Sequence, residues 1–187
     1  MRIGFAVCAS FCTHRKMLHV LEELSRNNDV VPILSESCIS NDTRFGLARD
    51  ICKKIEQICG RKIIWNIVDA EPLGPTEALD ALIICPCTGN TLAKIANGIT
   101  DTSVTMAAKA HLRSDRPLLA ALATNDAMSA NLKNIASLLQ RKNVYFVPMK
   151  QDSPESKPHS LVADFDLVLP CLELAIQGKQ KRPLFLE

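Results

Sequence analysis

The sequence predicts an α/β protein built on a doubly wound, mostly parallel sheet. Short apolar runs of strand length alternate with amphipathic segments of helical spacing along the whole chain. Small or hydroxylated residues follow several of the apolar runs, as they do where a strand leads into a turn. No internal repeat or heptad pattern is present. Because 187 residues suffice for one sizeable core, we expect a single domain over residues 1–187.

The expected elements alternate in chain order. The predicted strands span residues 2–8, 29–34, 63–68, 80–85, 117–123 and 144–148. The predicted helices span residues 13–28, 45–59, 91–97, 101–113, 128–140 and 161–177. Pro170 lies inside the last helix and should kink or divide it. Residues 150–160 are predicted to be a mobile loop, and residues 178–187 a basic and then apolar tail. This alternation is typical of Rossmann-like or flavodoxin-like three-layer sandwiches.

Composition excludes several classes of protein. A net charge of +2 is too small to indicate nucleic acid as the main partner, and one Trp, one Tyr and six Phe offer few stacking surfaces for bases. No apolar run approaches membrane-spanning length, and the first apolar stretch is too short for a signal peptide. We therefore expect a soluble cytoplasmic protein.

Eight cysteines raise the question of disulfides or a metal. Cytosolic thiols stay reduced, and no Cys-x-x-Cys pair is present, so we predict no metal centre. One alternative stays open, because Cys8, Cys12, Cys85 and Cys87 flank the ends of two predicted strands. If those strands are neighbours, the sulfurs could form a thiol or metal site instead of simply packing.

The most informative stretch lies between residues 82 and 101. A buried apolar run ends at Pro86, small and hydroxylated residues follow, and a helical pattern then begins. Ligands of open parallel sheets bind beyond the carboxyl ends of the strands, and a helix N-terminus attracts phosphate. Thr88 and Asn90 add side-chain donors there. The sequence therefore predicts one wall of a ligand site at this turn.

Polar residues follow the other predicted strands as well. Parallel strands bring their carboxyl ends to one edge, so we expect these side chains to converge: Ser10, Ser35, Ser37, Thr88, Asn90, Thr124 and Asn125. Hydroxyls and helix N-termini suit a phosphate, and an apolar wall suits a planar ring. No Gly-x-Gly-x-x-Gly follows the first strand and no Walker pattern exists, so a mononucleotide fits better than a dinucleotide. The alternative is that these residues only cap helices.

The stretch Pro86-Cys87-Thr88-Gly89-Asn90-Thr91, followed by Lys94, Asn97-Gly98 and Asp101, resembles a motif of the FMN-binding flavoprotein family. The motif reads Pro-x-Ser/Thr-x-Asn-Thr-x-x-Lys-x-Ala-Asn-Gly-x-x-Asp, and the family includes cysteine decarboxylases and flavin prenyltransferases. The resemblance implies FMN as cofactor, with Ser10, Ser35 or Ser37 at its phosphate and Thr88 and Asn90 beside it. Thr124, at the end of another predicted strand, is a further candidate contact to the cofactor. It also implies that Asn125 contacts a substrate carboxylate and that the protein forms trimers or multiples of trimers.

More narrowly, the whole chain is similar to the B subunits of bacterial dipicolinate synthases. The features that carry this are Ser10-Phe11-Cys12-Thr13, residues 41–46, 70–75, 107–110 and 123–127, and Gln151-Asp152-Ser153-Pro154 with Lys157-Pro158. This resemblance implies oxidation of dihydrodipicolinate to dipicolinate in the mother cell of a sporulating bacterium. The A subunit of dipicolinate synthase would be the partner and would bring NAD(P).

Four residues are candidates for contact with such a dicarboxylate substrate. Arg44 is the leading carboxylate clamp because its guanidinium offers a paired fork. Lys157 and His159, on the predicted mobile loop, are second choices. His14, next to the first loop, is a candidate proton donor. Each has an ordinary alternative as a solvated surface residue.

Two departures from the family pattern bear on function. The first loop reads Cys8-Ala9-Ser10 where relatives carry Thr-Gly-Ser, and losing the glycine limits close approach of backbone to a phosphate. The histidine that the decarboxylases use is absent from residues 69–79, where Pro72 stands. Three hypotheses follow: a flavin-bearing oxidoreductase subunit, a non-catalytic assembly subunit without cofactor, and an FMN-dependent decarboxylase, the last disfavoured by the missing histidine.

Overall fold

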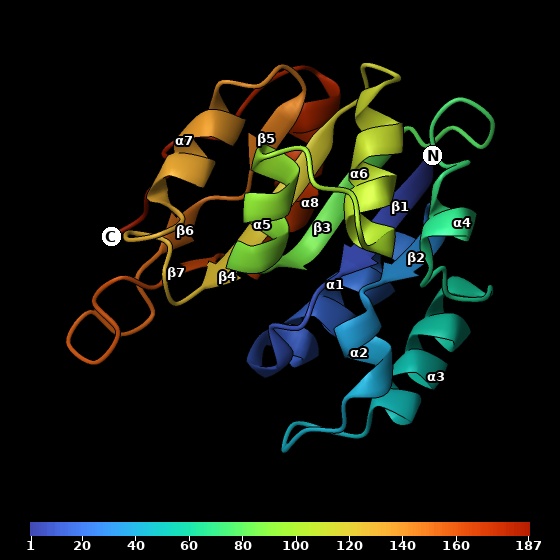
Figure 1. The fold of residues 1–187 in the computed structure, drawn as a ribbon, viewed down its shortest axis with the longest axis horizontal. Coiled ribbons are helices and arrows are strands. Elements are labelled where there is room, and N and C mark those ends of the chain that lie inside the picture. Colours follow the sequence, from blue (N-terminus) through green and yellow to red (C-terminus); the bar gives the residue numbers. More distant parts are fainter.

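A seven-stranded sheet forms the centre of the computed structural model, which describes residues 1–187 (Figure 1). Its strands run in the order β2-β1-β3-β4-β7-β6, and β5 also pairs with β4. Their bounds are β1 Arg2–Val7, β2 Asp29–Leu34, β3 Ala81–Cys87, β4 Leu118–Thr124, β5 Val144–Phe146, β6 Met149–Lys150 and β7 Leu161–Ala163. The pairs β1–β2, β1–β3, β3–β4 and β4–β5 are parallel. The mostly parallel α/β fold predicted from the sequence is confirmed.

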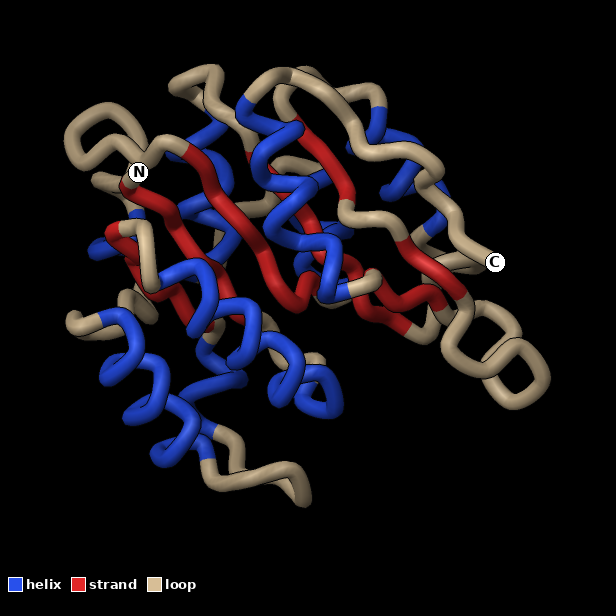
Figure 2. The backbone as a smooth tube through the Cα atoms, turned by 180° about the vertical axis from the view of Figure 1, so that it is seen from behind, coloured by secondary structure: helices blue, strands red, loops and turns tan.

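Helices cover both faces of the sheet. Their bounds are α1 His14–Ser25, α2 Glu36–Ser40, α3 Ala48–Cys59, α4 Ile67–Ala70, α5 Gly89–Ala96, α6 Ser103–Leu112, α7 Leu132–Leu139 and α8 Val168–Ile176. Figure 1 looks onto the face that α5, α6 and α7 cover, and Figure 2 gives the view from behind. Helices α1, α3 and α8 supply buried residues to the core on the other face.

Alternation along the strands builds one core on each face. In β1, Phe5 belongs to a cluster of 22 buried residues with α1, α3 and α8, whereas its neighbour Ala6 belongs to a cluster of 26 with α4 to α7. Since successive side chains of a strand point to opposite faces, a central strand must be apolar at every position. All seven residues of β3 are buried. This is why β3 reads as an unbroken apolar run in the sequence.

The far edge of the sheet is antiparallel. Strand β7 pairs antiparallel with the end of β4 and with β6. The C-terminal tail lies beside β6, where Met149 accepts a backbone hydrogen bond from Leu186 and donates one to Leu184. The Gln180 side chain bonds both the N–H and the C=O of Phe146. The tail therefore pairs with backbone groups that an edge strand would otherwise expose.

Two predicted elements are wrong. Residues 63–68 form only an isolated bridge between Ile64 and Ile33, followed by the short helix α4. Residues 161–177 begin with strand β7, and the helix starts only at Val168 after a 3-10 turn over Phe165–Leu167. Pro170 is thus in the first turn of α8, where backbone N–H groups have no intrahelical partner, so it requires neither a kink nor a break.

No helix of the chain is both long and apolar enough to cross a membrane.

Substituting Gly74 tests the contact between the segment after α4 and helix α6. A Cβ there would clash with the backbone oxygen of Ala110, which cannot rotate away. We expect Gly74→Ala to lower the free energy of unfolding by about 2–3 kcal/mol in urea titrations. Glu71→Ala, an exposed change in the same segment, should stay within about 0.5 kcal/mol of the unaltered protein. Equal urea midpoints for the two variants would show that Gly74 does not pack closely against Ala110.

Candidate functional site

The turn after β3 presents free backbone donors. Thr88 is the N-cap of α5, and its Oγ1 accepts a hydrogen bond from the Thr91 N–H at 3.3 Å. The N–H groups of Gly89 and Asn90 have no acceptor within the chain. Such free amides at a helix start, with the positive end of the helix dipole, favour an anion. The predicted strand, turn and helix start are confirmed here.

The turn after β1 presents a free hydroxyl. The Ser10 carbonyl accepts hydrogen bonds from the N–H and the Oγ1 of Thr13, which closes a 3-10 turn over Phe11–Thr13. The Ser10 hydroxyl itself makes no hydrogen bond within the chain. The Cys8 N–H donates to the Pro86 carbonyl at 3.2 Å, so this turn is tied to the turn after β3.

His14 lies beneath the first turn. The ring is buried, its Nε2 is 3.1 Å from the Cys8 carbonyl, and Phe11 packs against it edge to face. A carbonyl can only accept, so Nε2 carries the proton in this contact. Burial lowers the pKa of His14, which favours the neutral ring. In this geometry His14 supports the turn and does not line the cavity, so the expectation of a direct proton donor lacks a contact to rest on.

The turn after β4 is held by a polar network that the sequence analysis missed. Asp126 accepts hydrogen bonds from Thr124 Oγ1 at 2.6 Å and from Asn131 Nδ2 at 2.9 Å. Asn131 Oδ1 in turn accepts from Asn134 Nδ2 at 2.8 Å, and both asparagines are buried. Because burying an unpaired amide is costly, this network fixes the turn. Its sequence signal is weak, since polar residues on an amphipathic helix usually face solvent.

Arg44 lies at the tip of a tight turn between α2 and α3. The backbone groups of Thr43 and Gly46 bond each other in both directions at 3.1 Å, and Gly46 has φ +145°. The Arg44 guanidinium lies 4.9 Å from the centre of the Phe45 ring. No carboxylate pairs with Arg44, so its charge is available to a ligand.

Lys157 is paired within its own loop. Its Nζ donates to Asp152 Oδ2 at 2.7 Å, and both side chains are partly exposed. This contact lowers the pKa of Asp152 and raises the pKa of Lys157. His159 lies in the same loop and contributes its carbonyl to the Met128 N–H.

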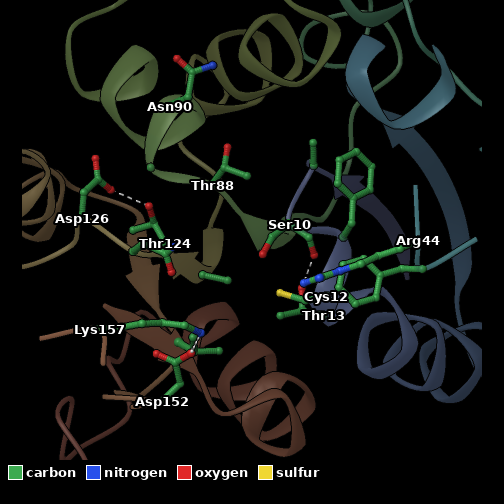
Figure 3. A pocket seen from close by; sticks show the side chains of 17 residues that line it. Ser10, Cys12, Thr13, Arg44, Thr88, Asn90, Thr124, Asp126, Asp152 and Lys157 are labelled. Carbon is green, nitrogen blue, oxygen red and sulfur yellow. Dashed lines mark hydrogen bonds and ion pairs between the residues drawn. The ribbon is translucent and has the colours of Figure 1, made fainter. Parts of the chain in front are cut away.

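These turns surround a cavity of about 590 Å³ (Figure 3). It is lined by 17 residues, among which are these predicted site residues: Ser10, Arg44, Thr88, Asn90, Thr124, Asn125 and Lys157. Figure 3 shows Thr88 and Asn90 above the charged ends of Arg44 and Lys157, with the Asn90 side chain directed away from them. Phe11, Phe45 and Val162 add apolar surface. A cavity of this size, with a few convergent polar groups, can hold a small molecule.

Two predicted residues do not reach the cavity. The Ser35 hydroxyl donates to Cys38 Sγ at 3.3 Å, and Ser37 is exposed on α2. Helix α2 begins directly after β2, and the Ser35 N–H donates to the Val7 carbonyl at the end of β1. Ser35 and Ser37 therefore do not line this cavity, and their assignment to the cofactor phosphate stays a prediction.

The cysteines do not gather into a metal centre. No group of three or more His, Cys, Asp or Glu side chains is placed to hold a metal ion. Cys8, Cys85 and Cys87 are buried, and burial raises the pKa of each thiol. Cys8 accepts a hydrogen bond from Thr91 Oγ1 at 3.3 Å, whereas Cys12 is exposed at the cavity. Three of the four sulfurs are therefore packed as core residues.

Comparison with known proteins agrees with this geometry. The model of the Flavoprotein family matches residues 1–164. The chain belongs to the Flavoprotein family. It is 42% identical over 187 residues to the B subunit of dipicolinate synthase from Bacillus subtilis (strain 168), covering 100% of this chain and 94% of that protein. The narrower resemblance found in the sequence is thereby confirmed.

Solved structures give the same result. The B subunit of dipicolinate synthase from Bacillus halodurans has a TM-score of 0.91 at 39% identity, covering 100% of this chain and 96% of that one. An FMN-dependent cysteine decarboxylase has a TM-score of 0.70 at 23% identity, covering 95% of this chain and 97% of that one. This chain and the cysteine decarboxylase therefore share the same fold.

None of the four histidines of this Flavoprotein family member lines the cavity. His14 and His111 are buried against carbonyls, and His19 lies beside Glu23 on the surface of α1. Residues 69–79, where the family resemblance places the histidine of the decarboxylases, precede Asp80. Asp80 and Glu77 are hydrogen-bonded to Arg2, at the amino ends of the strands. No imidazole of this chain is therefore placed for proton transfer in the cavity.

Thiol labelling tests the placement of the cysteines. Cys12 is the exposed thiol, whereas burial raises the pKa of Cys38 to about 12 and that of Cys59 to about 11. In native protein at neutral pH, we expect one thiol to react rapidly with a disulfide reagent, and Cys12→Ser should abolish this phase. Cys59→Ser should preserve it. A rapid phase that persists in Cys12→Ser would contradict the placement.

Proposed function

We propose that this chain binds FMN in the cavity and acts with a partner A subunit to oxidise dihydrodipicolinate to dipicolinate. The observation that carries the proposal is one cavity that joins free hydroxyl and amide donors to an unpaired arginine. The 42% identity to a dipicolinate synthase B subunit supports it. Such a protein would work in the cytoplasm of the mother cell of a sporulating bacterium.

The residues present fit FMN. The cavity volume of about 590 Å³ lies within the range of small-molecule sites. The Ser10 hydroxyl and the free N–H groups of Gly89 and Asn90 suit a phosphate, because they lack partners in the protein. Thr88 and Thr124 would lie beside the cofactor. When bound, FMN supplies an acceptor for two electrons.

The substrate would be held through its carboxylates. Arg44 offers two parallel N–H donors, and stacking on Phe45 limits how far the guanidinium can turn. Asn125, exposed at the cavity, offers an amide donor to the same ligand. Lys157 offers a second cation from the other side. These groups would bind and orient a planar dicarboxylate.

The reaction removes a hydride from a ring carbon and a proton from elsewhere on the dihydropyridine ring. The product is aromatic, which favours the oxidation. The hydride acceptor is FMN or the NAD(P) that the proposal assigns to the A subunit. This chain contributes binding and orientation of the ring, since it places no histidine at the cavity.

One alternative has an observation in its favour. Ala9 replaces the glycine of the family's first loop and lines the cavity, and a residue with a Cβ limits how closely the backbone can approach a phosphate. An assembly subunit that retains the fold and has lost the cofactor would tolerate this change. The decarboxylase hypothesis has no comparable support, because no histidine lines the cavity.

Assembly is part of the proposal. The chain would form a homo-oligomer, a trimer or a multiple of trimers, and would bind the A subunit of the synthase. Flavin content and dihydrodipicolinate oxidation, each measured with and without that partner, separate the hypotheses. Flavin-bearing protein that is active only with the partner supports the proposal. Colourless protein that still restores activity with the partner supports the assembly role instead.

Removing the Ser10 hydroxyl tests the cofactor site. Because this hydroxyl has no partner in the protein, Ser10→Ala deletes only a ligand contact. We expect the FMN dissociation constant to rise about tenfold in a flavin-fluorescence titration. Ser37→Ala removes an exposed hydroxyl outside the cavity and should leave that constant unchanged. If the FMN dissociation constant rises in Ser37→Ala and not in Ser10→Ala, the phosphate binds at the end of β2 instead.

Removing the Arg44 guanidinium tests the carboxylate clamp. In the two-subunit complex, Arg44→Ala should raise KM for the dicarboxylate about tenfold with a smaller change in kcat, since binding is lost in ground and transition states alike. Arg49→Ala removes an exposed arginine of the same segment that does not line the cavity. If both variants change KM equally, Arg44 has no specific role.

A further inference from the structure

The cavity contains negatively charged side chains, although its proposed ligand is itself an anion. Two acidic residues line it, Asp126 and Asp152. The carboxylate of Asp126 accepts from uncharged donors of the turn after β4. Asp152 instead bonds the one cation that stands across the cavity from Arg44 (Figure 3). The Lys157 ammonium is therefore already paired with a carboxylate of this chain.

The Asp152–Lys157 contact is a local and reversible one. The two side chains come from the same loop, are 31% and 47% exposed, and meet at 2.7 Å. An ion pair with this exposure is held weakly, and water or another carboxylate can replace either partner. Glu155, in the same loop, makes no ion pair and does not line the cavity. Of the two acidic residues in this loop, only Asp152 therefore pairs with Lys157.

We propose that Asp152 occupies the second carboxylate subsite and is exchanged there for a carboxylate of the ligand. One carboxylate of a planar dicarboxylate pairs with Arg44, and the other displaces Asp152 from Lys157. No bond is made or broken, and the lysine stays paired before and after the exchange. This inference rests on the proposed function and adds a residue that competes with the ligand.

The exchange has two consequences for recognition. A monocarboxylate can bind the unpaired Arg44 directly. To bind Lys157, it must displace the Asp152 carboxylate, which is held in the same loop. A dicarboxylate anchored at Arg44 brings its second group at high effective concentration, so it wins that competition. After release, Asp152 pairs with Lys157 again. Asp152 would therefore limit binding of stray anions and favour product release, at some loss of dicarboxylate affinity.

Calorimetric titration of the FMN-loaded, full-length chain tests the exchange. The probes are pyridine-2,6-dicarboxylate and pyridine-2-carboxylate at low ionic strength. Asp152→Asn should tighten dicarboxylate binding about twofold to fivefold, because the competitor is gone. Glu155→Gln makes the same change in net charge in the same loop and should alter binding by a smaller factor. In a Lys157→Gln background, Asp152→Asn should have no further effect on dicarboxylate binding.

Three results would overturn the inference. Weaker dicarboxylate binding in Asp152→Asn would show that Asp152 positions Lys157 for the ligand. An effect equal to that of Glu155→Gln would show a general charge effect only. Persistence of the effect without Lys157 would show that the two residues act separately. If neither probe binds and Arg44→Ala changes nothing, the proposed substrate site itself fails, and the exchange fails with it.

Discussion

The parallel alignment of β1, β3 and β4 is the constraint on which the site depends. Ala6 pairs with Ile84, and Ile84 pairs with Ala120, so the three strands end at the same edge. The bond from the Cys8 N–H to the Pro86 carbonyl extends this alignment past the last paired residues. The turns that carry Ser10, Thr88 and Thr124 therefore meet at this edge of the sheet.

Local patterns of this kind can be predicted from the sequence. A buried strand is an apolar run, and a helix start carries a capping residue, so the turn at Thr88 is visible in the amino-acid order alone. The same rule finds Ser10, Thr124 and Asn125. Ser35 and Ser37 also follow a strand, but α2 begins at once after β2 and neither serine lines the cavity. Which polar turn faces the ligand depends on the element that comes after the turn.

Contacts between distant or competing patterns cannot be predicted in this way. The short strand β7 is apolar, like the helix that comes after it, so residues 161–177 read as one helix until β4 and β6 are seen to pair with β7. The charges at the cavity show the same limit. Lys157 is recognisable as a loop cation, but the choice of Asp152 over Glu155 as its partner depends on loop geometry. The asparagines at the start of α7 become meaningful only beside Asp126.

Gly89 links these features. A Cβ there would lie 2.5 Å from Asn131 Nδ2, 2.6 Å from Thr124 Oγ1 and 2.7 Å from Asp126 Oδ1. The absence of a side chain therefore lets the network of the β4 turn pack directly on the first residue of α5. It also places the Asp126 carboxylate at the positive end of that helix, where it offsets part of the helix dipole. An anion at this edge then gains less from α5 than from an isolated helix start, and it depends more on other donors of the cavity, such as the Ser10 hydroxyl and the Arg44 guanidinium.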